Sequence, residues 1–331
     1  MLIKNELKGS NNKLSKTVYH YSNNNIAFNI LKSKEIWLSD IKKSSDYLEM
    51  QLFFPGILDS IQKCYDENPF PLIYNKKQDR EALMDLLDIY YRVTIEQMEK
   101  NKISNFAICF SEESDLLSQW RAYADDGRGC CIGFDVRKIQ SFCQRNSNVF
   151  RFQKVKYIKE TDIPLLLKRE AELILKTLSG LREWIVENFS CREDLDDTDG
   201  LLVFNFSGMV DSVITDSLGY KSITFKEEKE WRLFMQNSQF KHPDFVFRDD
   251  ELDFGPNITT ATVSLLKNRM EFNIKKNDIV SYFPISFSEL NNPLASLIIG
   301  PKSNINEIDA ELYLKKHTLE AEIGHSKISY Y

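Results

Sequence analysis

The chain has 331 residues, of which 42% are hydrophobic and 28% charged, and its formal net charge is −6. This length suffices for one large domain or two ordinary ones, and the composition argues against long disorder. The negative charge disfavours a surface that binds nucleic acid nonspecifically over its whole extent. The sequence shows no signal-peptide pattern and no apolar stretch of membrane-spanning length, so we expect a cytoplasmic protein without a membrane segment.

The six cysteines of the chain include no C-x-x-C pair. This spacing argues against a zinc site and against a disulfide framework, and we expect no bound metal. The sequence also lacks the glycine-rich Rossmann and P-loop motifs and the metalloprotease motif H-E-x-x-H. The common nucleotide-binding folds are therefore not supported.

The first predicted elements are a strand at 17–22, a ten-residue helix capped by Asn23–Asn25, and a strand at 35–39. Further strands are expected at 103–111, 129–135, 149–157, the end of 222–235, 259–265, 268–274, 279–288, 294–300 and the closing K-I-S-Y-Y. Helical periodicity covers 46–65, 77–100, 115–124, 136–145, most of 161–217, and 305–317. Strands at both ends and helices in two blocks are typical of a mixed α+β fold. We expect a single domain over residues 1–331, with 161–217 as a helical insertion within it.

The first polar and aromatic cluster is Y-H-Y-S at 19–22. In a strand, His20 and Ser22 point to one side and Tyr19 and Tyr21 to the other. His20 is one of only four histidines, and it either packs in the core or contacts a ligand. The residues alone leave both interpretations open.

The second cluster lies in a strand, helix, glycine turn and strand at 110–135. Leu116, Trp120 and Tyr123 fall on one helical face, and such a stripe is typical of a helix that faces a core. The compact order of elements also brings polar residues to one edge. A core role and a ligand-binding role therefore both stay open for this helix.

The third cluster is K-E-E-K-E-W-R-L-F at 226–234. In an extended chain Glu228 and Glu230 face one way, and Trp231 and Leu233 face the other. Paired acids of this kind form either the solvated edge of a sheet or a carboxylate pair that stabilises a positively charged sugar transition state.

Taken in order, these clusters resemble a widespread bacterial family of uncharacterised proteins. The shared motifs are Y-H-Y-S at 19–22, S-D-Y-L-E at 45–49, F-S at 110–111, Q-W-R-x-Y at 119–123, G-x-C-I-G-F-D at 129–135, E-K-E-W-R at 228–232 and I-I-G-P at 298–301. The chain departs from the family pattern at Ser45 and Tyr47, where members usually carry Asn and Pro. The resemblance spans most of the chain but implies no activity.

The Y-H-Y-S strand, the short helix with its lysine-rich end and the strand I-W-L-S also resemble, more distantly, the start of ADP-ribosyltransferases that act on nucleic acid. This resemblance implies a split mixed β-sheet core with helical insertions, and NAD as the substrate. It implies that His20 and Ser22 hold NAD and that Trp120 or Tyr123 stacks on the nicotinamide. The remaining residues of the implied NAD-binding set are Tyr21, Ser39 and Arg121.

The same resemblance implies roles for the E-x-E pair. Glu230 would stabilise the ribosyl cation that forms when NAD is cleaved, and Glu228 would orient or deprotonate the acceptor. His20 would fix a ribose by a hydrogen bond. We therefore expect His20 and Glu230 to face one cleft.

The predicted function is that of an NAD-dependent ADP-ribosyltransferase, a toxin or phage-defence effector that modifies RNA, DNA or protein, with a neutralising antitoxin as a candidate partner. A local basic groove would suit RNA binding, built from Arg121, Arg128, Arg151 and Lys154. Two alternatives stay open. One is a noncatalytic binding or sensor module on the same fold, and the other is a metal-dependent nuclease that uses Asp46, Glu49, Glu228 and Glu230.

Overall fold

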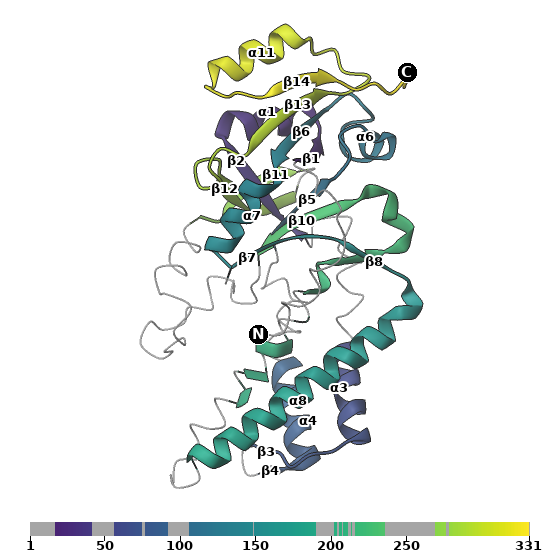
Figure 1. The fold of residues 1–331 in the computed structure, drawn as a ribbon, viewed down its shortest axis with the longest axis vertical. Helices are drawn as coiled ribbons and strands as arrows, with labels where there is room; N and C mark the ends of the chain where they lie inside the picture. Colours follow the sequence, from purple (N-terminus) through teal and green to yellow (C-terminus); the bar gives the residue numbers. More distant parts are fainter. Residues whose placement is uncertain are drawn as a thin grey trace.

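The computed structural model describes residues 17–41, 56–74, 77–91, 106–147, 149–189, 202–203, 205–206, 208–210, 213, 216–235, 269–275 and 278–330. Within these ranges the chain forms a mixed α+β structure, which confirms the predicted fold class at that level (Figure 1). The predicted strand at 259–265 and the motif at 45–49 lie outside the described residues.

Ten of the described strands form one large sheet. They are β1 (Thr17–Ser22), β2 (Glu35–Asp40), β5 (Phe106–Ser111), β6 (Cys130–Asp135), β7 (Phe150–Lys154), β10 (Glu230–Met235), β11 (Glu271–Lys275), β12 (Asp278–Ser286), β13 (Leu294–Ile299) and β14 (Glu322–His325). Their order is β11-β12-β2-β5-β1-β6-β13-β14, while β10 pairs with β5 and β7 pairs with β10. All pairs are antiparallel except β13 with β14. Two small sheets pair β3 (Ile73–Tyr74) with β4 (Lys77–Gln78) and β8 (Lys156–Ile158) with β9 (Tyr220–Ser222).

One face of the large sheet carries the main hydrophobic core. Because side chains alternate along a strand, Val18 of β1 shares this face with its register partner Phe134 of β6, and both are fully buried. Three helices bury apolar residues in the same core, namely α1 (Asn24–Ser33), α7 (Val136–Arg145) and α11 (Glu307–Lys316). The opposite face carries smaller apolar clusters, one of them around Trp120 of α6 (Leu117–Tyr123).

A second core lies among helices at the far end of the molecule from β14 (Figure 1). Its helices are α3 (Gly56–Glu67), α4 (Asp79–Tyr90) and α8 (Ile163–Phe189). The helical block is therefore assembled from two stretches far apart in sequence, and the segment 161–217 supplies only one of them. No helix of the described residues, α8 included, combines the length and the apolar character needed to cross a membrane.

The local sequence pattern predicts the structure correctly at the start of the chain and incorrectly at its end. The Asn23 side chain accepts the backbone N–H of Ile26 at 2.9 Å, so the predicted cap of α1 is confirmed. The predicted strand K-I-S-Y-Y is wrong, because residues 326–330 form no strand and lie beside α6 (Figure 1). The Asp115 carboxylate accepts hydrogen bonds from Ser326 Oγ at 2.6 Å and from the Lys327 N–H at 2.7 Å. These two bonds hold the segment in place without strand pairing.

Candidate active site

Three strands of the large sheet align at one point, which we call the β1–β5–β10 junction. Ser111 of β5 pairs with Tyr19 of β1 on one side and with Glu230 of β10 on the other. The edge of β5 that pairs with β1 at Ser111 pairs with β2 at residues 106–107. Between these contacts, residues 108–110 of β5 have no described ladder partner on that edge, so the sheet is split there.

Four charged side chains beside the junction form what we call the Lys221 cluster, namely Lys221, Glu228, Glu230 and Arg232. Lys221 Nζ lies 2.7 Å from Glu228 Oε2 and 3.1 Å from Glu230 Oε2. Arg232 donates from Nε to Glu230 Oε1 at 2.5 Å and from Nη2 to Glu230 Oε2 at 3.2 Å. The four side chains are between 1% and 13% exposed, so two positive and two negative charges balance each other in a largely dry environment.

The chain builds this cluster with a short turn of helix between two strands. The 3-10 helix η4 (Ile223–Glu228) follows β9, and Lys229 then adopts a left-handed conformation with a φ of 46°. This turn brings Glu228 back to Lys221, and Phe225 covers the Lys221 ammonium with its ring centroid 4.8 Å from Nζ. The two glutamates therefore converge as expected, although through a helical turn rather than an extended chain.

The cluster keeps the Glu230 carboxyl ionised. Burial raises the pKa of this carboxyl, but the charge and hydrogen bonds of Arg232, the charge of Lys221 and a hydrogen bond from the Cys109 side chain outweigh burial and hold the pKa below its usual value. The Glu230 N–H donates to Tyr157 Oη at 2.8 Å, and burial raises the pKa of that phenol to about 12. Glu230 is therefore a carboxylate at neutral pH.

His20 lies at the split of the sheet. Its Nδ1 donates a hydrogen bond of 3.0 Å to the Cys109 carbonyl, because a carbonyl oxygen can only accept. Burial lowers the pKa of His20 against the opposite effect of this bond, so the ring is neutral at pH 7 and Nε2 is an acceptor. Ser22, on the same side of β1, is buried, and its Oγ has no hydrogen-bond partner in the described part of the chain.

The strand register places His20 and Glu230 on opposite faces of the sheet. Tyr19, Ser111 and Glu230 are register partners and share one face, so His20, one residue after Tyr19, projects from the other. The expectation that His20 and Glu230 face one cleft is therefore not met. Cys109 connects them instead, since its carbonyl binds His20 and its side chain binds Glu230.

The other residues of the implied NAD-binding set are scattered. Trp120 is fully buried, its Nε1 donates to a carboxylate oxygen at 2.7 Å, and its ring packs edge-on against Tyr21 with centroids 4.9 Å apart. Tyr21 is buried as well, and its hydroxyl binds backbone groups. Arg121 and Tyr123 are exposed on α6, and Ser39 is exposed on β2. Trp120 and Tyr21 are thus packing residues here, and Tyr123 is the exposed member of the two stacking candidates.

Two of the four residues of the predicted basic groove are paired with acids. Arg151 forms an ion pair with Asp216. Lys154 lies 2.8 Å from a carboxylate oxygen of Glu112. Arg128 is exposed on the turn after α6. The positive charges of Arg151 and Lys154 are therefore balanced, and those of Arg121 and Arg128 are exposed.

The metal-dependent alternative concerns four acidic residues. Asp46 and Glu49 lie outside the described residues. The other two acids, Glu228 and Glu230, are bound to cationic side chains in the Lys221 cluster. Within the described residues, no group of three or more His, Cys, Asp or Glu side chains is placed to hold a metal ion.

Sequence reasoning missed Lys221, Cys109 and Tyr157. No strand or helix period links Lys221 to the glutamates, because η4 and a left-handed residue intervene. Cys109 and Tyr157 meet Glu230 through pairing between distant strands. The role of Arg232 did have a signal, since two residues of separation in a strand place it on the face of Glu230.

Residues 119–233, about a third of the chain, match the family described as Protein of unknown function (DUF2971). The match runs from α6 into β10 and contains the whole Lys221 cluster, but neither β1 nor β5. It agrees with the predicted resemblance to an uncharacterised family. No curated protein and no solved structure matches the chain.

Proposed function

We propose that the chain is an NAD-dependent ADP-ribosyltransferase in which Glu230 is the catalytic carboxylate, Glu228 orients the acceptor and His20 contacts a ribose of NAD. The proposed acceptor is a nucleic acid or a protein, and the proposed role is that of a toxin or phage-defence effector. In this proposal the split sheet is the core of an ADP-ribosyltransferase fold. The observation that carries the proposal is the ionised Glu230 carboxylate, which Cys109 joins to His20 at the split.

The state of Glu230 suits the chemistry. Cleavage of the bond between nicotinamide and ribose develops positive charge on the ribosyl group. A carboxylate that is already ionised and held in place stabilises this charge as it forms. Because nicotinamide leaves as a neutral molecule, the reaction needs no strong general acid.

The residues at the split fit the ribose part of NAD better than its nicotinamide ring. The Nε2 atom of His20 accepts a hydrogen bond, and Ser22 Oγ is a buried hydroxyl without a partner in the described ranges. Ribose hydroxyl groups both donate and accept. Trp120 does not fit a stacking role because it is buried. Tyr19 is half-buried and shares the face of Glu230, so it is the better-placed aromatic.

The proposal requires that substrate reaches a carboxylate that is 3% exposed. Phe225 covers Lys221 from η4 and is itself exposed to solvent. The 3-10 helix has poorer hydrogen-bond geometry than an α-helix. We therefore propose that η4 moves aside and takes Phe225 off the cluster when NAD binds.

A noncatalytic binding or sensor module is the second candidate, and the burial of Glu230 favours it. In that case the Lys221 cluster is a charge-balanced part of the core with no chemical role. The two candidates differ in one observable, because only the transferase releases nicotinamide from NAD.

The test is incubation of the full chain with NAD labelled separately in the nicotinamide and adenine parts, with RNA, DNA or cell protein as acceptor. The transferase releases labelled nicotinamide and leaves the adenine label on one acceptor pool. A chain that releases no nicotinamide with any acceptor refutes the catalytic proposal. Release that persists on addition of EDTA also separates this activity from that of a metal-dependent nuclease.

The site assignment needs variants that keep the charge balance of the cluster. Lys221→Met/Glu230→Gln removes one cation and the proposed catalytic carboxylate, and leaves Arg232 with Glu228. Its matched control, Lys221→Met/Glu228→Gln, leaves Arg232 with Glu230. The first variant is expected to lose nicotinamide release, and the control to retain release but lose transfer to the acceptor. Equal release by both variants contradicts the role of Glu230.

A further inference from the structure

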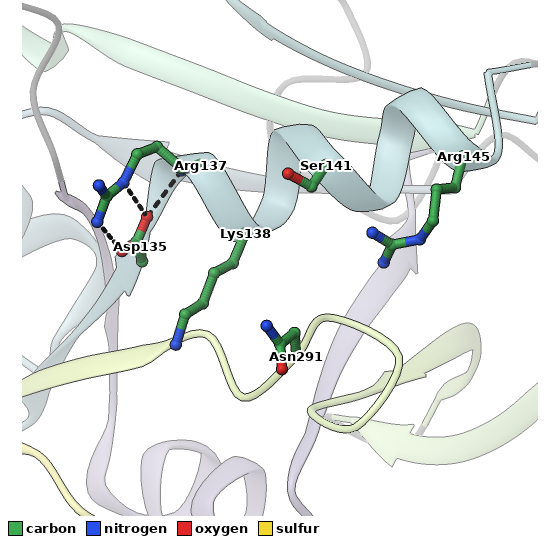
Figure 2. A pocket seen from close by; sticks show the side chains of 6 residues that line it. All are labelled: Asp135, Arg137, Lys138, Ser141, Arg145 and Asn291. Atoms are coloured by element: carbon green, nitrogen blue, oxygen red, sulfur yellow. Dashed lines mark hydrogen bonds and ion pairs between the residues drawn. The ribbon is translucent and has the colours of Figure 1, made fainter.

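The outer face of α7 carries a second group of charged side chains, around a hollow of about 360 Å³ (Figure 2). The inner face of this helix is buried in the main core. The polar residues recur on the outer face with the period of a helix. The hollow is lined by Asp135, Arg137, Lys138, Ser141, Arg145 and Asn291.

Two cations of this face are held by neutral groups. Lys138 Nζ donates to the Asn292 carbonyl at 2.7 Å, and Arg145 Nη2 donates to the Glu289 carbonyl at 3.1 Å. Figure 2 shows both side chains reaching from α7 toward the loop that carries Asn291. Neither Lys138 nor Arg145 forms an ion pair with a carboxylate within the described residues, so the positive charge of each is unbalanced there.

The nearby acids do not change this balance. The Glu289 carboxylate faces Arg269 and accepts hydrogen bonds from it at 2.7 and 2.5 Å. Asp135 pairs with Arg137 at 2.9 Å and also caps α7 by accepting the Arg137 N–H at 2.8 Å. The lining of the hollow therefore carries three positive charges and one negative charge, on a protein whose formal net charge is −6.

We propose that this hollow binds the phosphate groups of a nucleic-acid strand. Each cation uses one donor on a carbonyl and keeps further donors, because an ammonium has three N–H groups and a guanidinium five. Lys138 and Arg145 are seven positions apart, which is about 10 Å along a helix at about 1.5 Å per residue. In a double helix the phosphates of one strand rise about 3.4 Å each along the axis, so the two cations are far enough apart to contact different phosphates of a strand. A single phosphate ion reaches only one end.

The proposal does not depend on the chemistry proposed for the Lys221 cluster. Linked phosphates also occur in free nucleotides, so the experiment must separate a strand from a nucleoside triphosphate. Binding of the full chain is measured by fluorescence anisotropy with a labelled single-stranded RNA and a labelled DNA, and with a labelled nucleoside triphosphate, over a range of salt concentrations. Inorganic phosphate serves as the competitor in each case.

The proposal predicts that Lys138→Ala/Arg145→Ala weakens oligonucleotide binding about ten-fold or more and lowers the salt slope by about 1.4, which is about 0.7 for each contact with a single strand. Arg145→Lys keeps the charge and is expected to retain binding. Asp135→Asn is expected to tighten binding and to steepen the slope, because Asn still caps the helix while the only negative charge of the lining is removed. The matched control is Lys315→Ala, an exposed cation on α11 that pairs with Glu311.

A nucleoside triphosphate that binds while oligonucleotides do not overturns the assignment to a nucleic-acid strand and identifies the hollow as a site for free nucleotides. Binding that is equal in wild type and Lys138→Ala/Arg145→Ala overturns the proposal, as does the absence of binding to every probe. Urea unfolding of each variant shows whether the turn that Lys138 and Arg145 hold is still folded. The gain of binding in Asp135→Asn is the outcome that a purely structural role of this face does not produce.

Discussion

Replacement of Lys221 by Met tests whether the Lys221 cluster is a charge-balanced core. Met keeps most of the length and apolar character of the lysine stem and removes its charge. The Lys221 side chain is 1% exposed, and its partners Glu228 and Glu230 are 13% and 4% exposed. After the substitution the Lys221 cluster holds two carboxylates and one guanidinium, so its charges no longer balance.

The size of the effect follows from this burial. Removing one partner of a buried ion pair costs about 3–5 kcal/mol, because the remaining charge has lost its water and its partner. This is a large part of the total stability of a domain, which is about 5–15 kcal/mol. The exposed pair of Lys315 with Glu311 gives the matched control, with side chains 68% and 56% exposed. Lys315→Met is expected to cost about 0.5 kcal/mol or less.

The assay is urea unfolding followed by circular dichroism, from which the free energy of unfolding is obtained for each variant. A double variant that restores the charge balance gives a second, stricter test. Lys221→Met/Glu228→Gln removes one charge of each sign, so it is expected to regain more than half of the stability lost by Lys221→Met. A loss below about 1 kcal/mol for Lys221→Met, or no recovery in the double variant, refutes the assignment of this lysine as the counter-charge.

Three further predictions concern single positions. The pKa of Glu230 is lower in the folded chain than the usual value of about 4.3, so wild type loses stability as the pH falls from about 5 through the folded pKa. Glu230→Gln lacks this titrating group and is expected to lose less stability over the same pH range. Urea unfolding at a series of pH values measures the difference. Trp120→Phe removes a buried hydrogen bond and is expected to cost about 1–3 kcal/mol without changing the KM for NAD, and a raised KM restores the stacking role. Gly129→Ala places a Cβ 2.2 Å from the Ser22 carbonyl oxygen and is expected to lower the free energy of unfolding by about 1–3 kcal/mol. Gly180→Ala in α8 places its Cβ in open space and is expected to raise the free energy of unfolding by up to about 1 kcal/mol. Thermal unfolding of both variants measures these changes.

The parts of the fold that were predicted from sequence are those set by neighbouring residues. Asn23 has the side chain that caps a helix, and the alternation at 17–22 is visible without knowledge of any partner strand. The predicted C-terminal strand is wrong because K-I-S-Y-Y has the composition of a strand, whereas hydrogen bonds from Ser326 and Lys327 go to Asp115, which is far away in sequence. Tertiary contacts decided the structure of that segment.

The candidate site shows the same division. The convergence of Glu228 and Glu230 was expected from their spacing in an extended chain, but it arises from the η4 turn, which brings both carboxylates to one ammonium group. The sequence alone could not predict which face of the sheet His20 and Glu230 occupy, because this depends on the register of β1 and β10 against β5. That register is fixed at Ser111, and a shift by one residue would exchange the faces.

The proposed catalytic carboxylate and the α7 hollow lie on different faces of the same sheet, so variants at one do not directly alter the other. Ile139 of α7 is buried in the core with Val18 and Phe134, whereas Glu230 lies on the opposite face with its register partners. A strand held at α7 therefore has to pass round the sheet before it reaches the carboxylate. If such a strand is the acceptor, loss of the α7 cations raises the KM for the acceptor and leaves the cleavage of NAD by water unchanged. If release of nicotinamide also falls, the hollow and the junction are coupled through the sheet that lies between them.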